Sequence, residues 1–146
     1  MGWDAVFQVS STAAMVGWAV LILAPRWPGL MLGPRILIPG ALSLAYAAIM
    51  MAHLFSVEGG GFGSIEAVRA LFASDPVLVG GWQHYLAFDL FVGAWLAQRM
   101  DKADIHRVVQ TPILIATFMA GPLGFVLGLM VLGGRQGLSR LRGVAA

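Results

Sequence analysis

The sequence predicts an all-α integral membrane protein with four transmembrane helices. Of its 146 residues, 59% are hydrophobic and 11% are charged, whereas soluble domains contain about 45–50% apolar and about 25% charged residues. The mean hydropathy is +0.83. Four apolar stretches approach the length of about 20 residues that crosses a hydrocarbon core of about 30 Å. We therefore expect one transmembrane domain over residues 1–146, in which 134–146 form a short basic tail.

The first two spans are predicted at about 4–24 and 36–55. The first ends at Pro25, which cannot continue a helix. Pro39 falls in the first turn of the second span, where a missing N–H costs little. The chain start has neither a basic stretch nor a small-residue cleavage site, so the first span should stay in the mature protein.

The third and fourth spans are predicted at about 80–99 and 112–133. Thr111-Pro112 has the pattern of a helix N-cap followed by a first-turn proline. Gly121-Pro122 interrupts the fourth span, because Pro122 cannot donate to the carbonyl of Phe118. Two interpretations stay open: a tolerated kink, or a bend that opens a pocket beside the third span.

A short interfacial amphipathic helix is predicted near 64–74, after a glycine-rich segment. Ser64 would cap it, and Asp75-Pro76 would end it. Its apolar side would carry Ile65, Val68, Leu71 and Phe72. Such a helix lies on the membrane surface and acts either as a linker or as a lid.

The charged residues exclude some classes of function and leave the orientation open. The formal net charge is +2, which is ordinary for a protein facing anionic lipid and gives no reason to expect a nucleic-acid partner. The chain has no cysteine, which excludes disulfides, thiolate metal sites and cysteine nucleophiles. With four crossings, five Lys and Arg residues fall on one side and four on the other. This difference is too small to predict the orientation.

The most informative segment is 82–95, an apolar run that contains Asp89. A carboxylate at the bilayer midplane costs roughly 2.5–3.5 kcal/mol, so intramembrane acids usually have a partner or a function. Helical spacing places Trp82, Tyr85 and Asp89 on one stripe and His84 on another. His53 ends the second span and His84 begins the third, so an up-and-down bundle predicts both histidines at one membrane level.

Three interpretations of these polar residues remain open. The first is a structural hydrogen-bond network around Asp89. The second is a metal or haem site that uses His53 and His84, because a four-helix cytochrome takes its two axial imidazoles from facing helices. The third is acid–base chemistry on an apolar substrate held between helices.

Two segments resemble a known family. Residues 82–95, which read WQHYLAFDLFVGAW, and the later GPLG at 121–124 resemble the abscisic-acid-deficient-four-like family of small plastid and bacterial membrane proteins. The resemblance is specific over roughly 70–130, and the first two spans match only in length and apolarity. It implies a bacterial inner membrane or a plastid-type membrane, and a carotenoid context, because plant members are tied to neoxanthin synthesis.

The resemblance also implies a reaction and a set of residues. In plants, violaxanthin becomes neoxanthin by isomerisation without redox, which needs an acid at the epoxide oxygen and a base at C7. Asp89 and His84 are the candidates from the family motif, and Tyr85 and His53 are candidates from position. The substrate would lie in a groove lined by Trp82, Gly93, Gly121 and Gly124. The glycines have no side chain, and the Trp82 ring is flat, so a rigid rod-shaped molecule could pass along them.

The expected function is therefore that of a carotenoid isomerase or a related carotenoid-modifying enzyme without a cofactor or metal. One alternative is a non-catalytic subunit that binds a carotenoid or another long apolar pigment. A second is a four-helix protein that binds haem through His53 and His84. The expected partners are the pigment, membrane lipid, and either a membrane complex or a second copy of the chain.

Overall fold

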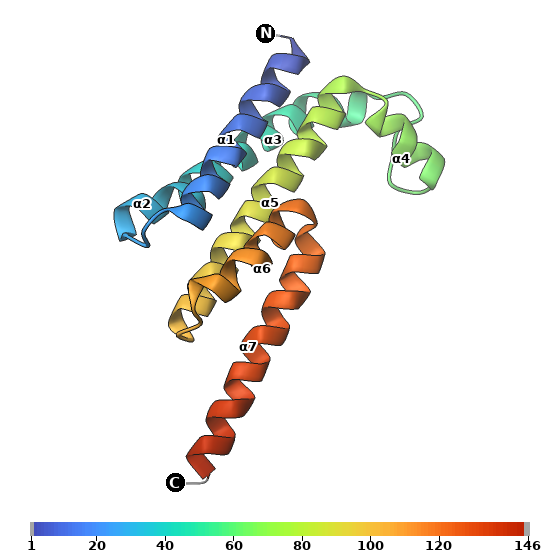
Figure 1. Cartoon of the computed structure of the whole chain (residues 1–146). Coiled ribbons are helices and arrows are strands. Elements are labelled where there is room, and N and C mark those ends of the chain that lie inside the picture. Colours follow the sequence, from blue (N-terminus) through green and yellow to red (C-terminus); the bar gives the residue numbers. More distant parts are fainter. Residues whose placement is uncertain (1, 145–146) are drawn as a thin grey trace.

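The computed structural model describes the backbone of residues 2–144 and the side chains of residues 2–135. This part of the chain is all-helical and contains no strand, which confirms the predicted all-α class. The central helix is α5, which contacts α1, α3, α4, α6 and α7 (Figure 1). The helices in chain order are α1 (Trp3–Leu23), α2 (Pro28–Leu32), the π-helical turn η1 (Gly33–Leu37), α3 (Ile38–His53), the 3₁₀ turn η2 (Leu54–Ser56), α4 (Ile65–Phe72), α5 (Asp75–Lys102), α6 (Arg107–Met119) and α7 (Gly121–Val144).

Two helices of the described chain are long and apolar enough to cross a membrane: α1, with 21 residues, and the continuous helix Pro28–Ser56, with 29 residues. The second begins earlier than the predicted start at residue 36. Pro28 occupies its first turn, where its fixed φ favours a helix. The helix then widens through η1, where the Ile38 N–H bonds to the Gly33 carbonyl, and so continues past two further prolines.

The predicted interfacial helix is present as α4, and Ser64 caps it as expected. The Ser64 Oγ accepts a hydrogen bond of 3.2 Å from the Ala67 N–H. In contrast to the prediction, Asp75-Pro76 opens the next helix, with Ser74 as its N-cap residue. Proline fits a first turn as well as a helix end, so α5 begins five residues before the predicted third span. Figure 1 shows α4 projecting from this end of α5.

The predicted fourth span, 112–133, is wrong as a single helix. α6 begins at Arg107, with His106 as its cap, and Pro112 lies inside it. Ala120 then adopts φ −153° and ψ 78°, and α7 turns back along α5 (Figure 1). Pro122 has no N–H to continue α6, while the Ala120 carbonyl accepts from the N–H groups of Leu123 and Gly124, so the break is hydrogen-bonded internally.

The reversal changes the expected topology. α6 has 13 residues and is about 20 Å long, which is shorter than a hydrocarbon core of about 30 Å. The expectation of four membrane-spanning helices is therefore not confirmed. The α6–α7 hairpin enters and leaves at the same end of the bundle, and the start of α1 and the end of α7 lie at opposite ends (Figure 1).

A polar cluster joins the helices at the end where the loops after α1 and α5 meet. Arg26 Nε lies 3.3 Å from Asp101 Oδ2, and Gln110 Nε2 donates to Asp101 Oδ1 at 2.8 Å. Burial lowers the pKa of Arg26, and the neighbouring Asp101 carboxylate opposes this change. Arg107 donates bonds of 2.9 and 2.6 Å to two carbonyl oxygens at the end of α1. These bonds satisfy backbone acceptors that a helix C-terminus leaves free.

Candidate functional site

α5 presents the polar residues of its motif to two different neighbours. Because a helix turns by about 100° per residue, His84 and Phe88 share one side, which faces α3. Tyr85 and Asp89 share another side, which faces the break between α6 and α7. The structure therefore separates His84 from Asp89, the two residues that the family motif offers as an acid–base pair.

On the first side, His84 lines a cavity of about 180 Å³ between α3, α4 and α5. The ring centroid of His84 lies 5.3 Å from that of Tyr46 on α3 and 4.6 Å from that of Phe88. Tyr46 and His84 are the polar aromatic residues in an otherwise apolar wall. The other lining residues are Met50, Leu54, Phe62, Leu71, Phe72, Val77 and Gly81.

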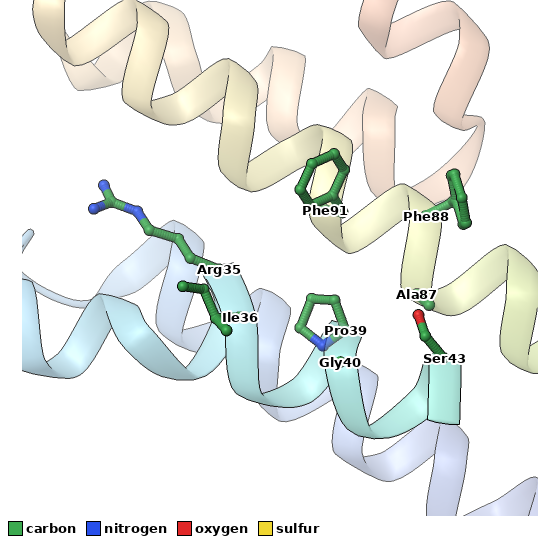
Figure 2. A pocket seen from close by; sticks show the side chains of 8 residues that line it. All are labelled: Arg35, Ile36, Pro39, Gly40, Ser43, Ala87, Phe88 and Phe91. Atoms are coloured by element: carbon green, nitrogen blue, oxygen red, sulfur yellow. The ribbon is translucent and has the colours of Figure 1, made fainter. Parts of the chain in front are cut away.

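A second cavity, of about 360 Å³, lies further along the same seam between α3 and α5. Figure 2 shows Phe88 and Phe91 on α5, which runs beside the η1–α3 segment, with Arg35 at one end of the cavity. The remaining lining residues are Ile36, Pro39, Gly40, Ser43 and Ala87. Since Phe88 lines this cavity and stacks on His84, the two cavities are neighbours along one side of α5.

On the other side, the Asp89 carboxyl group packs directly against Gly121 at the start of α7. A Cβ atom at Gly121 would collide with the carboxylate oxygens. Asp89 Oδ2 is buried and has no hydrogen-bond partner among the described residues. The Tyr85 hydroxyl donates a long hydrogen bond of 3.5 Å to the Met119 carbonyl, on the other side of the break. The positive N-terminal end of α7 thus faces a carboxyl group.

Trp82 lies on the same side of α5 as Tyr85, as helical spacing predicts. Their rings stack with centroids 5.2 Å apart, and Trp82 Nε1 donates to Ser11 Oγ on α1 at 2.9 Å. The side chain therefore has a hydrogen-bonded position between α1 and α5.

The two histidines proposed for haem have different partners. The His53 ring lies edge-on to Trp3 with centroids 5.4 Å apart, whereas His84 faces Tyr46. Tyr46 and His53 are seven residues apart on α3, which corresponds to about 10 Å along the axis. The structure therefore does not bring His53 and His84 together, and haem binding stays a prediction.

The glycines predicted to line a groove lie at contacts between segments of the chain. A Cβ atom would meet the Trp18 ring at Gly93, the Asp89 carboxyl group at Gly121 and the Thr117 backbone at Gly124. Trp18, Asp89 and Thr117 therefore already occupy the space beside these three glycines. Their role as a substrate groove stays a prediction.

The sequence reading missed several polar residues at contacts between helices. Tyr46 is a single polar aromatic in an apolar stretch, and nothing in the sequence pairs it with His84. Gln83 is 1% exposed, and its Nε2 donates to Ser10 Oγ at 2.8 Å. A polar residue in an apolar stretch indicates that its side chain has a partner. The identity of that partner depends on which helices lie side by side, which the sequence does not show.

The fold and the site define a class: an all-helical membrane protein whose central helix offers polar side chains to two neighbours. A protein-family model described as ABA4-like (ABA DEFICIENT 4-like) matches residues 5–127, which is most of the chain, and the chain belongs to this family. The match includes α1 and α3 as well as the 82–95 motif. No curated protein and no solved structure matches the chain. Family membership and the two long apolar helices place the protein in a membrane.

Proposed function

We propose that the protein is a multi-pass membrane enzyme that isomerises or otherwise modifies a carotenoid. The observation that carries this proposal is the pairing of His84 and Tyr46 in the wall of an apolar cavity between α3 and α5. Acid–base groups in an apolar cavity suit a substrate that is itself apolar. The resemblance to proteins tied to neoxanthin synthesis supplies the substrate class.

In the proposed topology, α1, the Pro28–Ser56 helix and α5 each cross the membrane once. α5 has 28 residues and a length of about 42 Å, enough to cross with both ends in the interface. The α6–α7 hairpin enters from one side and returns to it. Hairpins of this kind are tolerated at membrane depth where the freed backbone groups find partners within the protein. Here the Ala120 carbonyl accepts from the Leu123 and Gly124 N–H groups, and the Met119 carbonyl accepts from the Tyr85 hydroxyl.

The seam between α3 and α5 suits a long rod-shaped ligand. One cavity lies beneath α4, and the second reaches Arg35 towards the other end of α3. Phe88 and Phe91 supply flat apolar surface between these ends. We place the end ring of the carotenoid beside His84 and the polyene along the phenylalanines. α4 would then cover the ring and act as a lid, one of the two roles that the sequence allows for this helix.

The proposed chemistry is a proton transfer within one substrate molecule. For a 5,6-epoxide, the His84 imidazole takes the proton from C7 as the C6–O bond breaks and the C6–C7 double bond forms. The oxygen on C5 takes a proton from the Tyr46 hydroxyl and becomes an alcohol. The proton on His84 then returns to Tyr46, so the product is an isomer and no redox partner is needed. His and Tyr are both established general acid–base side chains.

Asp89 receives a structural role in this proposal. It lies on the side of α5 away from the His84 cavity, and its carboxyl group meets the start of α7. We assign it to holding the α6–α7 break. Asp89→Asn should therefore keep the turnover of each folded molecule and lower the thermal stability.

The proposal is tested by expressing the chain in bacteria that accumulate violaxanthin and by separating the extracted pigments chromatographically. The wild type should form a product, and His84→Gln and Tyr46→Phe should lower its yield at least a hundredfold, the usual scale of a general acid–base contribution. His106→Gln is the matched control, because His106 caps α6 away from this cavity. Thermal unfolding of each purified variant separates lost chemistry from lost fold.

Three results would contradict parts of this assignment. Full activity of His84→Gln would remove the imidazole from the mechanism. Loss of turnover in a stable Asp89→Asn protein would move the chemistry to the other side of α5. Copurification of unchanged carotenoid without any product would favour the non-catalytic pigment-binding subunit.

A further inference from the structure

A third cavity, separate from the His84 seam, lies between α5 and α7. Its volume is about 540 Å³. Arg99 and Lys102 on α5 provide its charge, and no acidic residue lines it in the part of the chain whose side chains are described. The apolar part of the lining consists of Trp95, Ala103, Leu129, Leu132 and Gly133.

The cations of this cavity are available to a ligand. The Arg99 guanidinium lies 5.2 Å from the centroid of the Trp95 ring, which holds it beside the cavity by a cation–π contact. Neither Arg99 nor Lys102 forms an ion pair, since the single salt bridge of the described residues joins Arg26 to Asp101. Arg135 on α7 adds a third positive charge nearby, where its Nε donates to the Ala103 carbonyl at 3.3 Å.

The position of the cavity indicates what it meets. Arg99 and Lys102 lie in the last turns of α5, at the end of the bundle that also carries the Arg26–Asp101 cluster. Gly128 of α7 lies beside Leu96 of α5 and Arg135 bonds to Ala103, so Leu132 is level with these charges. Leu129 and Trp95 continue the apolar lining towards the middle of α5. The cavity thus combines a cationic end with an apolar side, the arrangement by which basic pockets between membrane helices bind anionic lipid headgroups.

We propose that this cavity binds one anionic phospholipid. The phosphate lies between the side chains of Arg99 and Lys102, and an acyl chain runs along Trp95, Leu129 and Leu132. This site does not depend on the proposed carotenoid chemistry, because it lies between α5 and α7 rather than between α3 and α5 and uses none of the same residues. The Arg35 cavity offers a single cation and is the one assigned above to the carotenoid, so it is not the site proposed for the lipid.

Native mass spectrometry of the purified full chain tests the site. The protein is mixed with equal amounts of dioleoyl phosphatidylglycerol and dioleoyl phosphatidylcholine, and the bound lipids are counted. The wild type should retain phosphatidylglycerol preferentially. The double variant Arg99→Gln, Lys102→Gln should lose this preference about thirty-fold, as expected for the loss of two interfacial cations.

Two single variants keep the result interpretable. Lys102→Gln changes an exposed side chain and should lower the preference about fivefold even if the double variant fails to fold. Arg69→Gln is the matched control, because Arg69 is exposed on α4 at the opposite end of the molecule. It should leave the preference unchanged.

Fluorescence quenching locates the lipid. Phosphatidylglycerol with brominated acyl chains should quench the emission that the wild type has and Trp95→Phe lacks. Excess inorganic phosphate should leave this quenching in place, because the acyl chain contributes to binding.

The proposal would be overturned by equal binding of the two lipids to the wild type. It would also be overturned if the double variant kept the preference, if Arg35→Gln alone removed it, or if inorganic phosphate displaced the lipid.

Discussion

Gly121 is the residue at which the α6–α7 hairpin comes closest to α5. A Cβ atom there would overlap the Asp89 carboxyl group, so Gly121→Ala must push the carboxyl group or the start of α7 away. Overpacking of this kind costs about 1–3 kcal/mol. We expect lower thermal stability of the protein in detergent. Gly133→Ala on the same helix is the control, since a Cβ atom at Gly133 meets nothing within 4 Å; equal losses in both variants would refute the close contact.

Arg107 is the second residue whose removal should be costly. Its guanidinium donates to the carbonyl oxygens of Ile22 and Ala24, and Arg107→Ala leaves both acceptors without this partner. Hydrogen bonds to charged groups contribute about 1.5–3 kcal/mol, less where water can replace them, so we expect a loss of about 1–3 kcal/mol. Thermal unfolding of the purified protein measures it. Arg69→Ala, an exposed change on α4, should stay within about 0.5 kcal/mol of the wild type.

Helical spacing predicted which residues share a side of α5 but not what they face. It placed Trp82 with Tyr85 and separated His84 from Asp89, because these relations depend on one helix alone. The contacts of His84 with Tyr46 and of Asp89 with Gly121 join residues 38 and 32 positions apart in the sequence. The periodicity of one helix carries no information about which residues of another helix it contacts.

At the scale of elements, the α6–α7 hairpin is the largest departure from the sequence prediction. The residues are apolar on both sides of Ala120, so hydropathy cannot distinguish a straight helix from a reversed one. Gly121-Pro122 indicated an interruption, but a proline is compatible with a kink as well as with a complete break. The non-helical backbone of Ala120 decides between them, and contacts of the break with α5 that the sequence does not display stabilise it.

The hairpin predicts which positions share a side of the membrane. The chain has no cysteine, so single cysteines can be introduced at Lys102 and Arg135 and labelled with a membrane-impermeant maleimide. Both positions should react from the same side, because the hairpin returns to its point of entry. A cysteine at Ser64 should react from the other side. Labelling of positions 102 and 135 from opposite sides would restore the four-crossing topology.

At the scale of the whole molecule, the reversal gathers the positive charge at one end. The chain has nine Lys and Arg residues. Eight of them belong to α7 or to segments near the end of the bundle that carries the Arg26–Asp101 cluster (Figure 1). The ninth, Arg69, lies on α4. The four-crossing model divided the same residues almost evenly. The reversal between α6 and α7 therefore makes the charge distribution uneven enough to predict how the protein is oriented in the membrane.

The positive-inside rule then predicts the orientation. The charged end and the C-terminus should lie in the cytoplasm of a bacterial host, and the N-terminus on the opposite side. Green fluorescent protein fused to the C-terminus should fluoresce, and alkaline phosphatase at the same place should be inactive. The reverse pair of results would contradict the predicted orientation.

The most direct test of the central claim uses purified protein and violaxanthin in detergent, with the reaction followed by chromatography and mass spectrometry. The His84–Tyr46 cavity predicts a new carotenoid of unchanged mass, formed by the wild type and by His106→Gln but not by a folded His84→Gln variant. Recovery of the bound carotenoid unchanged from the wild type, or equal conversion by His84→Gln, would contradict it.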